Sequence, residues 1–230
     1  MEALNIQPLD YAVEPPILML AETEVERQWR VHACMKEPDT VAWMETFRQG
    51  DVLWDVGAST GPYSLVAARL GCTVVAFEPS SASYAHLCFN VWLNGLSGVV
   101  LPRPFAIGRA FGPVDTVLSP VAGGGQAHTE VRGEDYREAA LTCDGTVFGI
   151  PTPQPQHIKV DVDGAEVQVM EALRPELENA QSVLVELNAD TEADGTAIML
   201  GMGYLVESRN PRWGDKGRAN VVFRRGDASA

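Results

Sequence analysis

The chain has 230 residues, of which 17 are Lys or Arg and 31 are Asp or Glu, so its formal net charge is −14. Hydrophobic residues make up 46% of the chain and charged residues 21%, which is typical of a folded globular protein with a well-buried core. Proteins that bind duplex nucleic acid or an anionic membrane surface normally present an excess of Lys and Arg. The charge balance therefore argues against both kinds of partner.

The four cysteines are widely spaced and form no C-x-x-C pair (Cys34, Cys72, Cys88 and Cys143). Such spacing favours neither a disulfide framework nor a zinc site, and it is typical of a reducing compartment. The N-terminus has no cationic segment ahead of an apolar run, and no apolar stretch approaches the roughly 20 residues that span a bilayer. We therefore expect a cytoplasmic protein without a membrane segment.

The first part of the chain, residues 1–50, is expected to form an irregular and helical extension that packs on the core. Three prolines oppose regular structure in residues 1–21, whereas residues 22–35 are rich in helix formers. Apolar residues at a spacing of three to four predict a helix over 38–49, which Gly50 ends.

Residues 51–230 alternate between predicted strands and helices. Strands are expected at 52–56, 73–77, 99–107, 158–162, 182–187, 204–207 and 219–224, and helices at 62–70, 83–93, 165–173 and 191–200. Residues 112–156 are the least regular part, with a triple glycine and several prolines. The alternation predicts an α/β fold, a Rossmann-like, mainly parallel sheet of seven strands with helices on both faces. Ligands in such sheets bind beyond the carboxyl ends of the strands.

A glycine-bearing turn joins the first of these strands to the first helix, with the sequence Asp55-Val56-Gly57-Ala58-Ser59-Thr60-Gly61. Its glycines allow a close backbone approach to a ligand, although a plain structural turn is the alternative. Glu78 ends the next strand, 23 residues after Asp55, where a carboxylate can accept both hydroxyls of a ribose. The two features together predict an adenosine-type ligand, and they do not separate a nicotinamide cofactor from S-adenosylmethionine.

Five segments in order resemble the FkbM family of S-adenosylmethionine-dependent methyltransferases, over about residues 28–205. They are Lys36-Glu37-Pro38-Asp39-Thr40, the glycine turn with Tyr63-Ser64, Phe77-Glu78-Pro79, the pair Asn90 and Asn94, and Ile158-Lys159-Val160-Asp161-Val162-Asp163-Gly164-Ala165-Glu166. Ser59 stands where the family usually has Asn. The resemblance implies the class I methyltransferase fold and S-adenosylmethionine as the cofactor.

The resemblance also implies roles for single residues. The methionine portion of the cofactor would be held by Asp55 and the backbone of the turn, including Gly57, Ala58, Ser59 and Gly61. Glu78 would bind the ribose, and Glu37 would reach the ammonium group of the cofactor. Tyr63 and Asp163 complete the predicted cofactor-binding set.

The exit of the fourth strand carries the predicted catalytic residues. Strand alternation puts Lys159 and Asp161 on one face, where the carboxylate could act as a base toward a hydroxyl or bind a metal. With Glu186 and Asn188 at the end of the next strand, Asp161 would form an all-oxygen site of the kind that Mg²⁺ accepts. The alternatives are a structural Lys159–Asp161 ion pair and an Asp163 that caps the following helix.

Two further features are less specific. His128 follows the triple glycine on a loop that could cover the substrate, and it is a candidate base, although a solvated loop histidine is the alternative. Four basic residues late in the chain are expected to lie in a solvated loop, and the alternative is that an anionic substrate or partner docks there (Arg209, Arg212, Lys216 and Arg218).

The favoured function is methyl transfer to a hydroxyl of a small molecule or sugar. A nicotinamide-dependent oxidoreductase would need a full G-x-G-x-x-G and a Tyr-x-x-x-Lys pair, neither of which occurs. A protein that binds an adenosyl ligand without catalysis stays an alternative. Neither the acceptor nor the oligomeric state can be read from these motifs.

Overall fold

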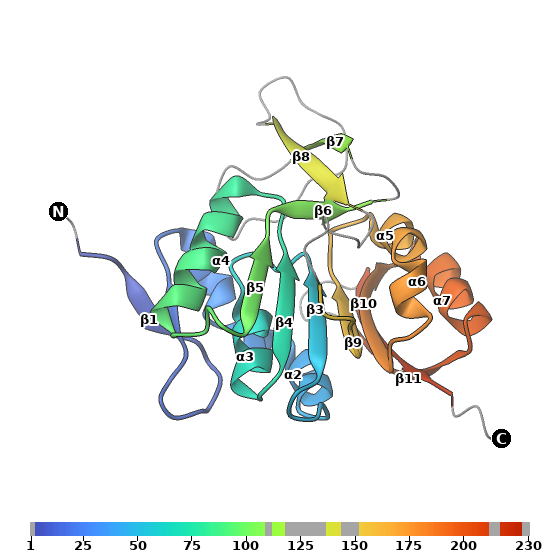
Figure 1. Ribbon diagram of the computed structural model, residues 1–230, viewed down its shortest axis with the longest axis horizontal. Coiled ribbons are helices and arrows are strands. Elements are labelled where there is room, and N and C mark those ends of the chain that lie inside the picture. Colours follow the sequence, from blue (N-terminus) through green and yellow to red (C-terminus); the bar gives the residue numbers. More distant parts are fainter. Residues whose placement is uncertain (1–2, 109–111, 118–136, 144–151, 212–216, 227–230) are drawn as a thin grey trace.

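The computed structural model describes residues 3–108, 112–117, 137–143, 152–211 and 217–226 (Figure 1). Its centre is a seven-stranded sheet in the order β11-β12-β10-β9-β3-β4-β5. These strands are β3 (Val52–Val56), β4 (Thr73–Phe77), β5 (Val100–Arg103), β9 (His157–Val160), β10 (Ser182–Asn188), β11 (Tyr204–Pro211) and β12 (Arg218–Arg225). β12 runs antiparallel to both of its neighbours, and the other pairs are parallel. The predicted mainly parallel seven-stranded sheet is thereby confirmed.

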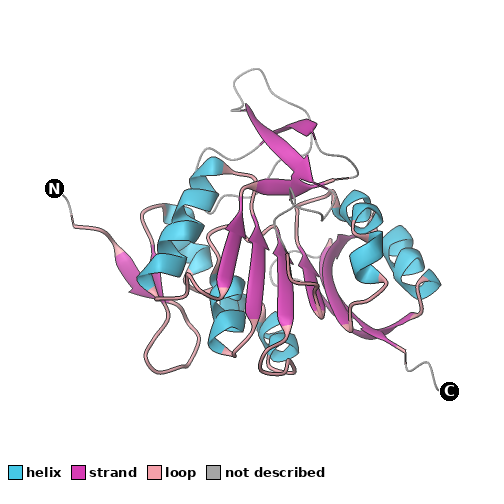
Figure 2. Cartoon of the chain, in the orientation of Figure 1, coloured by secondary structure: helices cyan, strands magenta, loops and turns pink. Residues whose placement is uncertain are grey.

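Helices cover both faces of this sheet (Figure 2). They are α2 (Pro38–Met44), α3 (Pro62–Arg69), α4 (Ser81–Leu93), α5 (Glu166–Ala172), α6 (Arg174–Leu177) and α7 (Glu192–Gly201). Successive strand residues enter two hydrophobic clusters, because neighbouring side chains of a strand point to opposite faces: Leu53 belongs to the cluster with α2, α3 and α4, and Trp54 to the cluster with α5, α6 and α7. No helix in the described ranges is long and apolar enough to cross a membrane.

The expectation of irregular structure in residues 1–21 is wrong in part. β1 (Ile6–Pro8) and β2 (Leu18–Leu20) form an antiparallel pair beside α4. Two asparagine side chains accept backbone N–H bonds from β2: Asn90 of α4 from Leu20 at 2.7 Å, and Asn94, the C-cap of α4, from Leu18 at 2.8 Å. These bonds to residues far away in the sequence stabilise the strand pair despite the neighbouring prolines. The sequence shows the prolines but not these distant partners.

The helical part of the extension is shorter than predicted. A π-helix, η1 (Glu26–Arg30), leads into α1 (Ala33–Lys36) and α2. α2 ends at Met44 instead of Gln49, since the Thr46 hydroxyl donates to the Trp43 carbonyl at 2.7 Å and local bonds replace the helical ones. Trp43 and Met44 enter the same hydrophobic cluster as Leu53, so the extension and the sheet share one core.

A second, three-stranded sheet has the order β6-β8-β7, from β6 (Phe105–Ile107), β7 (Gly112–Val117) and β8 (Arg137–Cys143). The single strand predicted over 99–107 is therefore two strands in two sheets, because Pro104 interrupts it. Residues 112–156, expected to be irregular, supply two of these strands. β6 directly follows β5, so the small sheet lies at the carboxyl edge of the main one (Figure 1).

Candidate active site

The turn between β3 and α3 has the strained backbone that a close ligand approach requires. Gly57 and Gly61 have φ angles of 86° and 92°, and Ser59 has 52°. A Cβ atom on Gly57 would lie 1.9 Å from the Asp161 carbonyl oxygen, so only glycine fits where β3 meets β9. The turn is further held by the N–H groups of Gly57 and Ala58, which both donate to the Phe77 carbonyl at 3.0 Å.

Glu78 lies at the end of β4 against this turn. Its carboxylate accepts the N–H of Ser59 and that of Ser80, each at 2.8 Å, and its side chain is buried. Burial raises the pKa of Glu78 to about 7, although the two backbone bonds lower it. Each carboxylate oxygen can accept a further bond, which is compatible with the predicted ribose role.

Two buried hydroxyl groups of the turn could bind the predicted cofactor. The hydroxyls of Ser59 and Thr60 are buried and have no hydrogen-bond partner among the described residues. Buried polar atoms are normally paired, so unpaired ones at a ligand-binding turn indicate a missing partner. The turn and Glu78 could thus hold the cofactor as predicted, and these roles stay predictions.

A buried charge cluster connects β3 to β9. The Lys159 ammonium lies 2.9 Å from Asp161 Oδ2 and 3.9 Å from Asp55 Oδ1, and its side chain is 1% exposed. Burial alone would lower the pKa of Lys159, but the surrounding carboxylates raise it by more than burial lowers it. The ammonium group therefore stays charged. Asp55 also accepts the Ser64 hydroxyl at 2.6 Å, and the ammonium sits 5.0 Å from the centre of the Tyr63 ring. Lys159 and Asp161 do share a face, as the strand alternation predicts.

Glu37 reaches this cluster from the start of α2. It is buried, and Lys36 Nζ lies 3.0 Å from its Oε1. Asn220 of β12 donates to its Oε2 at 3.3 Å. Glu37 also contributes to the raised pKa of Lys159. The structure therefore brings Glu37 close to Lys159, which lies more than 100 positions further along the sequence.

The prediction that Arg218 lies in a solvated loop is wrong. It opens β12, and its guanidinium donates to Asp163 Oδ1 at 2.7 Å and to Glu186 Oε1 at 2.9 Å. Asp163 has a φ of 56° and does not cap α5, whose N-cap, Ala165, has no side-chain cap bond. Sequence reasoning missed Arg218 because its partners are 32 and 55 positions away. The only available signal was the need of the buried Glu186 for a cation.

The predicted metal ligands do not form an open site. Oxygens of Asp161, Asp163 and Glu186 lie within 4.8 Å of one another, but Lys159 and Arg218 pair with these carboxylates. This network of ion pairs does not favour Mg²⁺, because each of the three carboxylates already pairs with Lys159 or Arg218.

The Asn188 side chain bonds to the backbone that immediately follows it. Its Oδ1 accepts the N–H groups of Asp190 and Thr191, at 2.9 and 3.0 Å, ahead of α7. Metal ligation by Asp161, Glu186 and Asn188 stays a prediction. His128, Arg212 and Lys216 lie outside the described residues.

Comparisons with known proteins were made in sequence and in structure. The chain is 28% identical to the hexuronic acid methyltransferase AglP of Haloferax volcanii over 182 residues, which cover 79% of this chain and 74% of that protein. It is 26% identical over 202 residues to a tRNA (guanine(37)-N(1))-methyltransferase of Coprinopsis cinerea, and the match covers 81% of this chain but only 43% of that enzyme. No protein-family model matches the chain.

Solved structures share the fold. The magnesium protoporphyrin IX methyltransferase of Synechocystis PCC 6803 with bound S-adenosylmethionine superimposes with a TM-score of 0.57 and 12% identity, over 89% of this chain and 85% of that one. The precorrin-6y C5,15-methyltransferase of Geobacter metallireducens has a TM-score of 0.54 and 11% identity, over 90% and 94%. The chain thus has the Rossmann-like fold of the class I methyltransferases, and the sequence and fold comparisons together support an S-adenosylmethionine-dependent methyltransferase.

Proposed function

We propose that the chain transfers the methyl group of S-adenosylmethionine to a hydroxyl oxygen of a small molecule or sugar. The observation that carries this proposal is the similarity to a hexuronic acid methyltransferase over about three quarters of both chains. The strained turn, the unpaired hydroxyls of Ser59 and Thr60 and the buried Glu78 support the cofactor. The five sequence motifs support a place in the FkbM family, and a cytoplasmic location stays a prediction.

The residues of the chain have separate tasks in this proposal. The sulfonium of the cofactor supplies an electrophilic methyl group, so the protein has mainly to align the acceptor oxygen with it. The turn and Glu78 hold the cofactor at the ends of β3 and β4. Asp161, at the end of β9, accepts the proton of the acceptor hydroxyl, and Lys159 fixes the position of that carboxylate through its 2.9 Å contact.

The acceptor class separates this proposal from its main alternative, a tRNA methyltransferase. That alternative has support from the 26% identical relative, of which the chain covers less than half. A net charge of −14 opposes it, because phosphate binding relies on Lys and Arg. We therefore favour the small acceptor.

Calorimetry and a labelled-methyl assay test the proposal together. We expect S-adenosylmethionine and S-adenosylhomocysteine to bind and NAD not to bind, and we expect label to pass to hydroxyl-bearing sugars and sugar acids but not to tRNA. Asp161→Asn should lower turnover by about 10²-fold or more, the usual scale for a lost base, while S-adenosylhomocysteine binds as before. Asp194→Asn, an exposed acid on α7, is the matched control and should change neither.

Three outcomes would contradict the proposal. Tight NAD binding without S-adenosylhomocysteine binding would make the chain a nicotinamide protein. Cofactor binding with no transfer to any hydroxyl acceptor would favour a non-catalytic role. Equal losses of turnover and cofactor binding in Asp161→Asn would give that residue a structural role only.

A further inference from the structure

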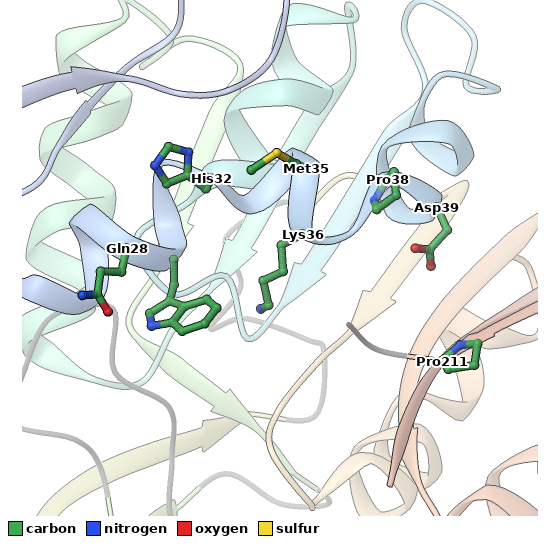
Figure 3. Close-up of a pocket in the computed structure, with 8 residues that line it drawn as sticks. Gln28, His32, Met35, Lys36, Pro38, Asp39 and Pro211 are labelled. Atoms are coloured by element: carbon green, nitrogen blue, oxygen red, sulfur yellow. The ribbon is translucent and has the colours of Figure 1, made fainter. Parts of the chain in front are cut away.

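A cavity of about 710 Å³ lies between the helical extension and the end of β11. η1, α1 and the start of α2 supply one wall, and Pro211 of β11 supplies the opposite one (Figure 3). β11 ends at the carboxyl edge of the main sheet, so the cavity opens at the same edge as the strand-end carboxylates. Its volume is within the range of small-molecule sites.

The wall of the cavity is directly continuous with the charge cluster. Lys36 and Asp39 line the cavity, whereas Glu37, between them in the chain, turns inward and is only 2% exposed. Asn220 donates to Glu37 at 3.3 Å, and its amide also counters the rise in the pKa of Asp39 that burial causes. A molecule in the cavity would therefore contact the neighbours of Glu37 in the chain, and Glu37 in turn helps to raise the pKa of Lys159.

The described lining combines large apolar side chains with one carboxylate. Trp29 and Met35 leave 45% and 72% of their surfaces exposed, which is unusual for large apolar side chains on one small surface. Asp39 is the one carboxylate among the described lining residues, and its side chain is half-buried. An ionised carboxylate can only accept hydrogen bonds, so a molecule in the cavity would meet Asp39 through a donor such as a hydroxyl.

We propose that this cavity is the acceptor site and takes a hydroxylated ring of sugar size. One ring hydroxyl donates to Asp39, and the carbon face of the ring rests on Trp29. This inference rests on the proposed function, because it names the place and the chemistry of the acceptor for that reaction. Asp39 and Trp29 are then determinants of acceptor binding and have no part in holding the cofactor.

The test measures binding and transfer separately on the full chain, with methyl β-glucuronide as the probe. Ligand-observed NMR on the chain saturated with S-adenosylhomocysteine gives the dissociation constant of the probe. Calorimetry on the ligand-free chain gives that of S-adenosylhomocysteine, and labelled S-adenosylmethionine gives the rate of methyl transfer and the KM for the probe. We expect Asp39→Asn and Trp29→Ala each to raise the former about tenfold, the scale of one lost hydrogen bond to a charged group or one lost apolar contact. S-Adenosylhomocysteine should bind both variants as it binds the unchanged chain, and the control Asp194→Asn should match that chain in both measurements.

The outcomes distinguish the two proposals. Probe binding that both variants weaken, without label transfer, would refute the proposed methyl transfer and support the cavity. Label transfer with unchanged KM for the probe in both variants would support the transfer and overturn the cavity. Absence of probe binding to the unchanged chain, or loss of S-adenosylhomocysteine binding together with probe binding in both variants, would also overturn it.

Discussion

Replacing Lys159 by Met should destabilise the fold more than any surface charge change. The ammonium is the cation shared by Asp161 at 2.9 Å and Asp55 at 3.9 Å, and the side chains of Lys159 and Asp55 are each 1% exposed. Without it, two carboxylates, of which that of Asp55 is almost fully buried, stay close together at neutral pH and lose the cation that they share. Removing one partner of a buried ion pair typically costs about 3–5 kcal/mol, and we expect a loss of that size in the free energy of unfolding. The total free energy of unfolding of a folded domain is about 5–15 kcal/mol, so this loss would be a large part of it.

Urea unfolding followed by circular dichroism at pH 7.5 measures this loss. Arg174→Met is the matched control, since Arg174 and Glu178 are both 62% exposed and 3.8 Å apart, and an exposed pair contributes only about 0–1 kcal/mol. Lys159→Met combined with Asp161→Asn should recover about 1–3 kcal/mol of the loss, because the second change removes one of the uncompensated charges. A loss below about 1 kcal/mol for Lys159→Met, or no recovery in the double variant, would refute the assignment of a buried charged lysine.

Three further predictions concern the turn and the clamp beside it. The pKa of Glu78 is raised to about 7, so its contribution to stability falls as the pH rises from its ordinary range through 7, whereas binding of ribose hydroxyls needs the ionised form. Calorimetry from pH 6 to pH 8 should therefore show tighter S-adenosylhomocysteine binding at higher pH, and Glu78→Gln should remove this slope; an unchanged slope would exclude the ribose role. Gly57→Ala should cost several-fold more stability than Gly50→Ala in urea unfolding, because both have positive φ but only Gly57 faces a backbone atom at 1.9 Å; equal losses would contradict the close approach. Arg218→Met removes two charge-assisted bonds from a guanidinium one third exposed, and should cost about 1–2 kcal/mol by the same assay while S-adenosylhomocysteine binding is kept; unchanged stability would show that the ion pairs contribute nothing.

The parallel core of the fold could be predicted because its signals are local. The apolar runs of β3 and β4 and the glycine turn between β3 and α3 stand in the sequence as they do in the structure. Turn glycines and buried strands depend on a few consecutive residues, so a pattern read along the chain is enough to find them.

The remaining parts depend on partners far away in the sequence. β2 is held by Asn90 and Asn94, which are at least 70 positions further on. Arg218 looked like one of several solvated cations until β12 placed it beside Asp163 and Glu186. Such contacts produce no periodic pattern in the sequence. The carboxylates at the strand ends indicate only that some cation should lie near them, and they do not indicate which one.

The position of β12 has a consequence for how the protein matures. This strand follows β10 and β11 in the sequence, yet it lies between them in the sheet. Until it inserts, β10 and β11 have no shared neighbour, and neither Arg218 nor Asn220 can reach Glu186 or Glu37. A chain that stops before residue 218 would therefore lack the strand that joins β10 to β11, and the contacts of Glu186 with Arg218 and of Glu37 with Asn220 can form only after β12 has been made.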